Sequence, residues 1–289
     1  MTLIVYILTN EYVVLASDRR LTTFAGSRVI RQEDRALKTF VLNGQILMGF
    51  TGLAEIAGEP MEDWLCDTLN GVEPNAIPDR LCASMNDYYA RTPHVRRYAH
   101  HFRLAGFAFN PTRTPSRFPI GFEVGNCSWI SRGGQAVVSD AQPTFSVIQN
   151  RFGNHGQVVG AIGSPYSLRE LRGLESAVRI ARHAAPSKPQ LTFAPLIDFM
   201  RGVARKSGGT VGETILISSL PKIATPMRGI SWNVPATPAG LEMASSDPMA
   251  MAIPADGSPP VHYLPAFIYP HVQAKGITLG AVESGPPTQ

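Results

Sequence analysis

The first residues of the chain carry a hydroxyl group that could act as a nucleophile. Thr2 follows the initiator methionine, and its small side chain permits removal of Met1. The new terminus would then carry a free α-amine and a hydroxyl on one residue. Because that amine can act as the general base for its own hydroxyl, no separate histidine is needed. The pattern predicts acyl chemistry at Thr2; the alternative is that Thr2 only begins an edge strand.

Lys38 is the cation that such a nucleophile would need. It is the only lysine among residues 1–187 and lies in an apolar run, where a charged group requires a partner. A cation near the α-amine would lower its pKa from the ordinary range of about 7.7–8.0 and favour the basic form. The alternative is a lysine that faces solvent on an edge strand.

The order of these residues resembles a known family. The chain is similar to the proteasome β-subunit and to the simpler bacterial ATP-dependent protease built from the same subunit fold, which are N-terminal-nucleophile threonine proteases. The resemblance is good through about Leu53 and does not cover the tail after about Leu220. The segments that carry it are Thr2-Leu3-Ile4-Val5, Val13 to Arg20, Ala36-Leu37-Lys38-Thr39-Phe40, Phe50-Thr51-Gly52-Leu53, Gly160-Ala161-Ile162-Gly163-Ser164 and Ser207-Gly208-Gly209.

The resemblance implies a role for each matching residue. Asp18 pairs with Lys38, although a local pair with Arg19 or Arg20 is the alternative from the residues alone. Gly52 donates its backbone N–H to the oxyanion. Ser164 and Ser207 support the amine of the threonine, where helix-end capping is the alternative.

The resemblance also implies a pocket and shows one departure. The residues that would line an apolar pocket beside the nucleophile are Leu21, Phe40, Phe50 and Ala54, which predicts cleavage after hydrophobic residues. For Phe50, ordinary core packing is the alternative. Ala204 occupies the position of an aspartate in the β-subunit pattern, so a carboxylate of the support shell is missing.

Composition excludes several other classes. The chain has 289 residues, 44% of them hydrophobic, which is enough for a large core. With 26 basic and 22 acidic residues, the charge does not require a nucleic acid, although the basic and aromatic stretch from Arg91 to Arg103 could touch one. No run is long enough for a membrane helix.

Three cysteines, Cys66, Cys82 and Cys127, lack metal-site spacing and fit a reducing cytoplasm. We expect no cofactor and no metal.

Hydrophobic periodicity predicts the elements that position these residues. The order is strands, two helices, strands, two helices and a strand, which indicates an α+β fold; the resemblance implies the four-layer αββα sandwich of N-terminal-nucleophile hydrolases. The hydrolase domain would span residues 1–220, and residues 221–289 would form a Pro/Gly-rich extension, extended or partly disordered. The residues of the four helical faces are Met61, Trp64, Leu65 and Leu69; Ile77, Leu81, Met85 and Tyr88; Leu168, Leu171, Leu174 and Val178; and Leu196, Met200, Val203 and Ala204.

The leading hypothesis is therefore a cytoplasmic threonine endopeptidase that acts on polypeptides through Thr2 after removal of Met1. By resemblance, it would form a homo-oligomeric ring and could work with an ATP-dependent unfoldase, without a nucleic-acid or membrane partner. Two alternatives stay open. One is a small-molecule amidohydrolase with the same nucleophile, and the other is a non-catalytic ring subunit.

Overall fold

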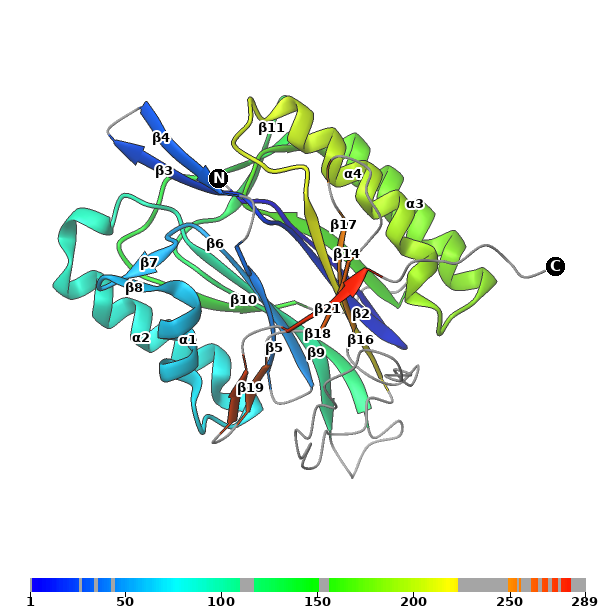
Figure 1. The fold of residues 1–289 in the computed structure, drawn as a ribbon, viewed down its shortest axis with the longest axis horizontal. Coiled ribbons are helices and arrows are strands. Elements are labelled where there is room, and N and C mark those ends of the chain that lie inside the picture. Colours follow the sequence, from blue (N-terminus) through cyan, green and yellow to red (C-terminus); the bar gives the residue numbers. More distant parts are fainter. Residues whose placement is uncertain are drawn as a thin grey trace.

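The chain folds as a mixture of α-helices and mainly antiparallel β-sheets, as an α+β protein does. Figure 1 shows the fold. The computed structural model describes residues 2–25, 28–33, 36–42, 45–109, 117–150, 156–222, 249–253, 255, 261–264, 267–269, 272–274 and 277–281.

The first large sheet has β1 (Ile4–Thr9) and β2 (Tyr12–Asp18) near its centre. The two strands are antiparallel, with Ile4 opposite Ser17, and Ile4 also lies opposite Ile162 of the neighbouring strand. Thr9 fixes the turn between them, because its hydroxyl accepts a hydrogen bond from the Tyr12 amide at 2.9 Å. The other strands of this sheet are β14 (Gln157–Ile162), β16 (Ile215–Pro221), β17 (Met249–Ile253), β18 (Val261–Leu264) and β21 (Ile277–Ala281).

The second large sheet has seven strands in the order β13-β10-β9-β6-β5-β19-β20 among the described residues. All its pairs are antiparallel except that of β19 with β5. The Asn43-Gly44 dipeptide between β5 and β6, whose residue types favour a tight hairpin turn, lies outside the described residues. The bounds are β5 (Thr39–Leu42), β6 (Ile46–Thr51), β9 (His101–Phe109), β10 (Arg117–Gly125), β13 (Ser146–Gln149), β19 (Phe267–Tyr269) and β20 (Val272–Ala274).

Three small sheets complete the β-structure of the described residues. Two are hairpins, and one joins three short strands. The first hairpin lies in the polar stretch 21–36. The strands are β3 (Leu21–Ala25) and β4 (Arg28–Glu33); β7 (Glu55–Ile56) and β8 (Glu59–Pro60); and β11 (Trp129–Arg132), β12 (Gln135–Val138) and β15 (Tyr166–Ser167).

Four α-helices form where the apolar periodicity predicts them. In α3, the Ser167 hydroxyl caps the first turn by accepting a hydrogen bond from the Glu170 amide. In α2, Pro78 lies in the first turn, where a missing amide proton costs little, and Tyr89 rather than Tyr88 is fully buried. The bounds are α1 (Met61–Leu69), α2 (Ile77–Arg91), α3 (Leu168–Ala184) and α4 (Phe193–Lys206), with 3-10 turns η1 (Pro74–Ala76), η2 (Pro93–Val95) and η3 (Pro189–Thr192).

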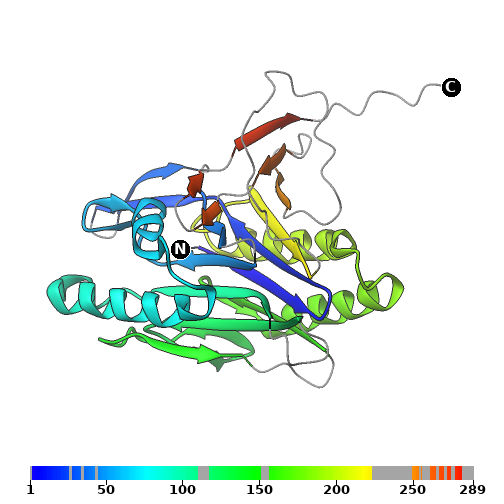
Figure 2. The same ribbon diagram turned by 90° about the horizontal axis from the view of Figure 1, so that it is seen from below.

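The two large sheets lie face to face, and a helical pair covers the outer face of each (Figures 1 and 2). Helices α1 and α2 pack on β5, β6, β9 and β10, and helices α3 and α4 pack on β1, β2, β14 and β16. A third cluster, with Ile4, Leu15 and Leu47 among its members, fills the space between the sheets. Because both faces of β1 and β2 are covered, these strands are buried along their whole length.

A buried charge cluster also joins the sheets. The Arg103 guanidinium of β9 donates to Glu123 Oε1 of β10 at 2.8 Å, and its Cζ lies 3.6 Å from the ring centroid of Tyr6 in β1. Gly121 makes room for it, since a Cβ there would lie 2.9 Å from the Arg103 Nη2. Arg103 is fully buried and held by opposite charge and an aromatic face, as a buried cation requires.

The tail after residue 220 is more regular than its composition predicted. Where described, it forms five short strands, three in the first large sheet and two in the second. Strand β17 pairs with β16 from Ile215↔Ile253 to Ser219↔Met249. The Pro and Gly residues between the strands hid this pattern, because each strand is only three to five residues long.

Two leucines that lie close together in the sequence should contribute very differently to the stability of the fold. Leu196→Ala empties a fully buried site beneath α4, so we expect a loss of about 2–5 kcal/mol in the free energy of unfolding. Leu191→Ala changes a side chain that is 47% exposed and should cost no more than about 0.5 kcal/mol. Urea unfolding of both variants tests this, and equal losses would contradict the packing described above.

Candidate active site

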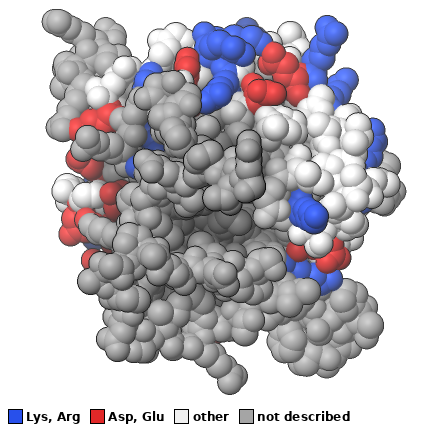
Figure 3. Space-filling model, turned by 45° about the vertical axis from the view of Figure 1, so that its right-hand side comes forward, with Lys and Arg blue, Asp and Glu red and all other residues white. Residues whose placement is uncertain are grey.

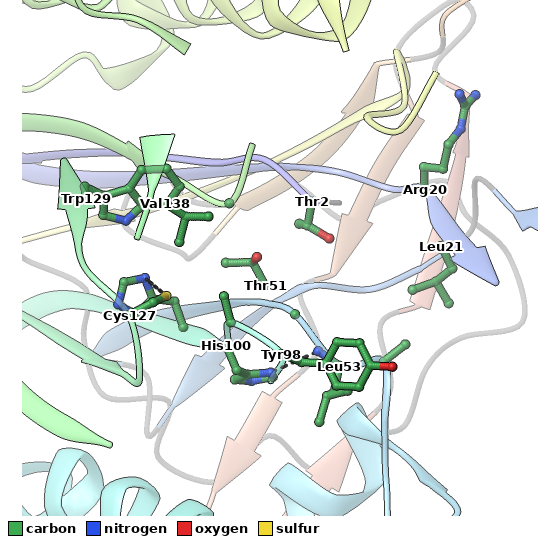
Figure 4. A pocket seen from close by; sticks show the side chains of 15 residues that line it. Thr2, Arg20, Leu21, Thr51, Leu53, Tyr98, His100, Cys127, Trp129 and Val138 are labelled. Carbon is green, nitrogen blue, oxygen red and sulfur yellow. Dashed lines mark hydrogen bonds between the residues drawn. The ribbon is translucent and has the colours of Figure 1, made fainter. Parts of the chain in front are cut away.

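A pocket of about 400 Å³ opens at one end of the two sheets. Its walls come from residues just before β1, after β6 and β14, and before and within β9, so both sheets contribute. Figure 4 shows Thr2 and Thr51 in its middle, with Leu21, Leu53 and Tyr98 to one side and Trp129, Val138 and Cys127 to the other. The remaining lining residues are Arg20, Gly52, Ala54, Ala99, His100, His101 and Gly163.

Thr2 lies at the start of β1 with its hydroxyl directed into this pocket (Figure 4). Its residue exposure is 8%. Gly163, which follows β14, packs against its backbone: a Cβ on Gly163 would lie 1.8 Å from the Thr2 carbonyl oxygen, and the φ of Gly163 is +106°. Both constraints require glycine at 163, and together they fix where the backbone of Thr2 lies.

Asp18 ends β2 beneath the same end of the sheet. Its Oδ1 accepts a hydrogen bond from the Leu3 amide at 2.8 Å, and its Oδ2 accepts from the Arg20 and Gly212 amides at 3.1 and 3.2 Å. The carboxylate therefore connects the residue after Thr2 to the loop that follows α4.

Lys38 meets Asp18 from the second sheet. Its Nζ lies 3.1 Å from Asp18 Oδ2, and both side chains have zero solvent exposure. The Nζ also donates to the Arg20 carbonyl oxygen. The structure therefore confirms the contact between Asp18 and Lys38. The local contact of Asp18 with Arg20 involves the backbone amide of Arg20.

Gly52 forms the bend after β6 that borders the pocket. Its φ is +115°, and a Cβ would lie 2.5 Å from His100 Nδ1 and 2.7 Å from the Ala99 carbonyl oxygen. The next amide, of Leu53, donates to His100 Nδ1 at 3.0 Å. A residue other than glycine would push the bend away from His100, so this backbone is held in one conformation.

The two serines lie in different surroundings. Ser164 follows Gly163 just after the end of β14 and is buried. Ser207 ends α4: its hydroxyl donates to the Ala204 carbonyl at 2.7 Å and accepts from the Val211 amide at 3.0 Å. Ser207 therefore shapes the loop that carries Gly212, and the Ala204 side chain is buried against the first sheet.

The four residues expected in the apolar pocket divide into two pairs. Leu21 and Ala54 line it. Phe40 and Phe50 do not belong to its lining; their rings stack on each other at 6.3 Å and lie in the core under α1 and α2. Phe50 also stacks on His100, so its aromatic ring supports the floor of the pocket from behind.

Sequence reasoning missed the histidine, cysteine and tryptophan side of the pocket. His100 and His101 were grouped with a basic stretch, yet both are buried. Burial, and then His101, lower the pKa of His100 to about 3, and burial lowers the pKa of His101. Cys127 Sγ lies 4.0 Å from His101 Nδ1, and burial raises the pKa of the Cys127 thiol to about 11. The only sequence signal was the position of the histidines at the start of an apolar strand.

Comparison with models of known protein families finds none that matches the sequence, and comparison with curated proteins finds no matching relative. Within the described residues, no cluster of three or more His, Cys, Asp or Glu side chains could hold a metal ion. None of the helices in that part of the chain is long and apolar enough to cross a membrane. The function therefore has to be inferred from the geometry of the pocket.

The close packing at Gly163 predicts a strong effect of one methyl group. Gly163→Ala should displace the Thr2 backbone and abolish covalent labelling of Thr2 by a threonine-directed electrophile, measured by intact mass. The matched control is Gly173→Ala in α3, where a Cβ meets no atom within 4 Å and alanine favours the helix. Normal labelling of Gly163→Ala would show that this glycine does not position Thr2.

The buried His100 predicts a pH-dependent stability. Its folded pKa lies below the unfolded value of 6.5, so the unfolded state binds a proton first as the pH falls. Stability present above pH 6.5 should decline by up to about 1.4 kcal/mol per pH unit down to about pH 3. His100→Asn, which keeps an acceptor for the Leu53 amide, should flatten this slope between pH 6.5 and 5 in urea unfolding. Measurement of both proteins at pH 8 gives the cost of the substitution itself, and identical slopes would refute the assignment.

Proposed function

We propose that the protein is a threonine endopeptidase of the proteasome β-subunit kind, with Thr2 as its N-terminal nucleophile after removal of Met1. The observation that carries the proposal is the position of Thr2 in the pocket, next in sequence to Leu3, whose amide donates to Asp18 of the fully buried Lys38–Asp18 pair. The order of helical pair, sheet, sheet and helical pair supports the four-layer αββα sandwich of the N-terminal-nucleophile hydrolases as its fold.

The chemistry requires one proton path. The Thr2 hydroxyl oxygen attacks the carbonyl carbon of the scissile peptide bond, and its proton passes to the α-amine of the same residue. The amine then protonates the leaving nitrogen, which departs as the new N-terminus and leaves an ester on Thr2. Water, deprotonated by the amine, hydrolyses this ester and restores the hydroxyl.

Lys38, Asp18 and Gly52 have separate roles in this scheme. The Lys38 ammonium disfavours a second positive charge nearby, so it keeps the α-amine in its basic form. Asp18 holds Lys38 charged through their 3.1 Å contact. The Gly52 backbone, fixed by His100 and Ala99, lines the pocket where its N–H could stabilise the oxyanion.

The lining of the pocket supports a preference for an apolar residue before the scissile bond. Leu21, Leu53 and Tyr98 lie together on one side of Thr2 (Figure 4). Their apolar surface would be covered by a hydrophobic side chain of a polypeptide substrate. By the same resemblance, we propose a cytoplasmic homo-oligomeric ring that could receive substrate from an ATP-dependent unfoldase, with residues 1–220 as the hydrolase domain and 221–289 as an extension.

A small-molecule amidohydrolase is the second candidate, because a pocket of about 400 Å³ falls within the range of small-ligand sites. It would use the same nucleophile on a simple amide. A panel of hydrophobic peptides against simple amides separates the two functions, since only the endopeptidase should cleave within the peptides.

The test of the proposal is the intact mass of the purified protein before and after exposure to a threonine-directed electrophile. We expect loss of Met1 and one adduct, mapped to Thr2. Thr2→Ser keeps a hydroxyl and should still be labelled, whereas Thr2→Ala should not react. Lys38→Arg keeps the charge but not the compact geometry, and should label much more slowly.

Two results would overturn the proposal. Retention of Met1 would leave Thr2 without its α-amine, and a free Thr2 that never reacts would indicate that the nucleophile is not activated. Either result favours a non-catalytic subunit, for which the missing carboxylate at Ala204 is the supporting observation.

A further inference from the structure

The pocket has a second wall that the proposed chemistry leaves without a role. Trp129, Val138 and Cys127 form it on the side of Thr2 opposite to the leucine side chains (Figure 4). His101 also lines the pocket and belongs to this wall, because its Nδ1 lies 4.0 Å from the Cys127 Sγ. We term these four residues, which come from the start of β9, the loop after β10 and the hairpin of β11 and β12, the tryptophan wall.

The aromatic ring of the tryptophan wall is held in a fixed position. Trp129 of β11 and Val138 of β12 are cross-strand partners, so both side chains lie on the same face of the small sheet. The Trp129 ring packs near those of His101 and Tyr166, at centroid distances of 6.4 and 5.9 Å. Strand β12 is in turn joined to β15 at the pair Ala136↔Tyr166. The wall is therefore formed before a ligand binds, which lowers the entropic cost of binding.

The tryptophan wall carries no charge at neutral pH. Burial lowers the pKa of His101, which keeps the imidazole neutral, and raises the pKa of the Cys127 thiol to about 11, which keeps the thiol protonated. Arg20, a charged residue of the pocket lining, lies away from this wall and donates to the Gly209 carbonyl (Figure 4). Many other Lys and Arg side chains lie on the outer surface, as along the top of Figure 3. A charged ligand group would thus lose water at the wall without a charged partner there, whereas an apolar group would gain buried area.

A polypeptide bound at Thr2 must extend in both directions from the bond that is cut. The proposed function places the residue before this bond on the side of Leu21, Leu53 and Tyr98. The residue after the bond then has to lie on the opposite side of the pocket, at the tryptophan wall.

We propose that the tryptophan wall binds the side chain that follows the scissile bond, and that it selects an aromatic or large aliphatic residue there. Packing against the Trp129 ring favours an aromatic side chain beyond the area that it buries. The inference rests on the proposed function and adds to it the class of substrate, which is a polypeptide with an apolar residue on each side of the bond that is cut.

The tryptophan wall acts at one stage of the reaction. The residue after the scissile bond departs with the leaving amine when the ester forms on Thr2, so it is absent while water hydrolyses that ester. Peptides that differ only at this residue therefore leave the same ester on the enzyme. Their difference has to arise in binding and in ester formation, which kcat/KM reports.

A panel of peptides tests this selectivity. All peptides carry leucine before the scissile bond, and the residue after it is phenylalanine, leucine, glycine, aspartate or lysine. We expect kcat/KM, measured by mass spectrometry of the products, to be at least about tenfold higher for the phenylalanine peptide than for the glycine peptide, because an apolar pocket discriminates by this order. The aspartate and lysine peptides should be cleaved no better than the glycine peptide, since a charge at the wall loses its water.

Two substitutions at Val138 connect the selectivity to the wall. Val138→Asp places a carboxylate there and should favour the lysine peptide over the aspartate peptide. Val138→Phe fills the space and should abolish the preference for phenylalanine over glycine. The matched control is Val137→Asp, because Val137 precedes Val138 in β12, is half-buried like it, and faces the other side of the strand. Each preference compares two substrates on one enzyme, so a general loss of activity cancels.

The proposal is overturned if the wild type cleaves the phenylalanine and glycine peptides equally well. It is also overturned if Val138→Asp folds, as urea unfolding verifies, and keeps the wild-type order of substrates. If that variant does not fold, Val138→Phe decides by the same criterion. Labelling of Thr2 separates this result from that of the proposed function. A labelled Thr2 without this selectivity, or without cleavage of any peptide, refutes the role of the wall, whereas an unlabelled Thr2 refutes the proposed function and the role of the wall with it.

Discussion

The buried contact between Lys38 and Asp18 is the interaction on which the site depends. It joins the end of β2 in one sheet to the residue before β5 in the other, and both side chains are fully removed from water. Such a pair is stable only if its remaining hydrogen-bonding groups are satisfied, and removal of one partner alone costs roughly 3–5 kcal/mol. Three backbone amides, of Leu3, Arg20 and Gly212, satisfy the carboxylate. The pair thus fixes the two sheets at the end where the pocket opens.

Two glycines fix the backbone on either side of the pocket. Gly163 presses on the Thr2 carbonyl from one side, and Gly52 bends against His100 on the other, each with a φ that favours glycine. His100 itself rests on Phe50 and accepts the Leu53 amide, so a neutral ring supports the bend. The backbone of Thr2 is therefore confined by Gly163, which leaves it little freedom to move. Preorganisation of this kind is what the proposed nucleophile and the proposed oxyanion donor would require.

Much of the fold could be predicted because its signals are local. The period of Met61, Leu65 and Leu69 is that of a helix packed on one face, and α1 forms there. The apolar runs of β1 and β2 indicate strands covered on both faces. Strands β17 to β21 could not be predicted, because such short strands owe their stability to pairing with β16 and β5, which no local pattern encodes.

The site was predictable only where chemistry restricts the residue type. A single lysine among residues 1–187, a hydroxyl at residue 2 and an aspartate at a strand end are rare enough to be noticed, and the structure brings Lys38 and Asp18 together. Phe40 and Phe50 were misplaced because strand alternation decides their direction: residues 40 and 50 face α1 and α2, whereas Val41 and Leu47 face the other sheet. Lys38 escapes this alternation because it precedes β5, so its side chain can turn inward to Asp18 while Phe40 turns outward.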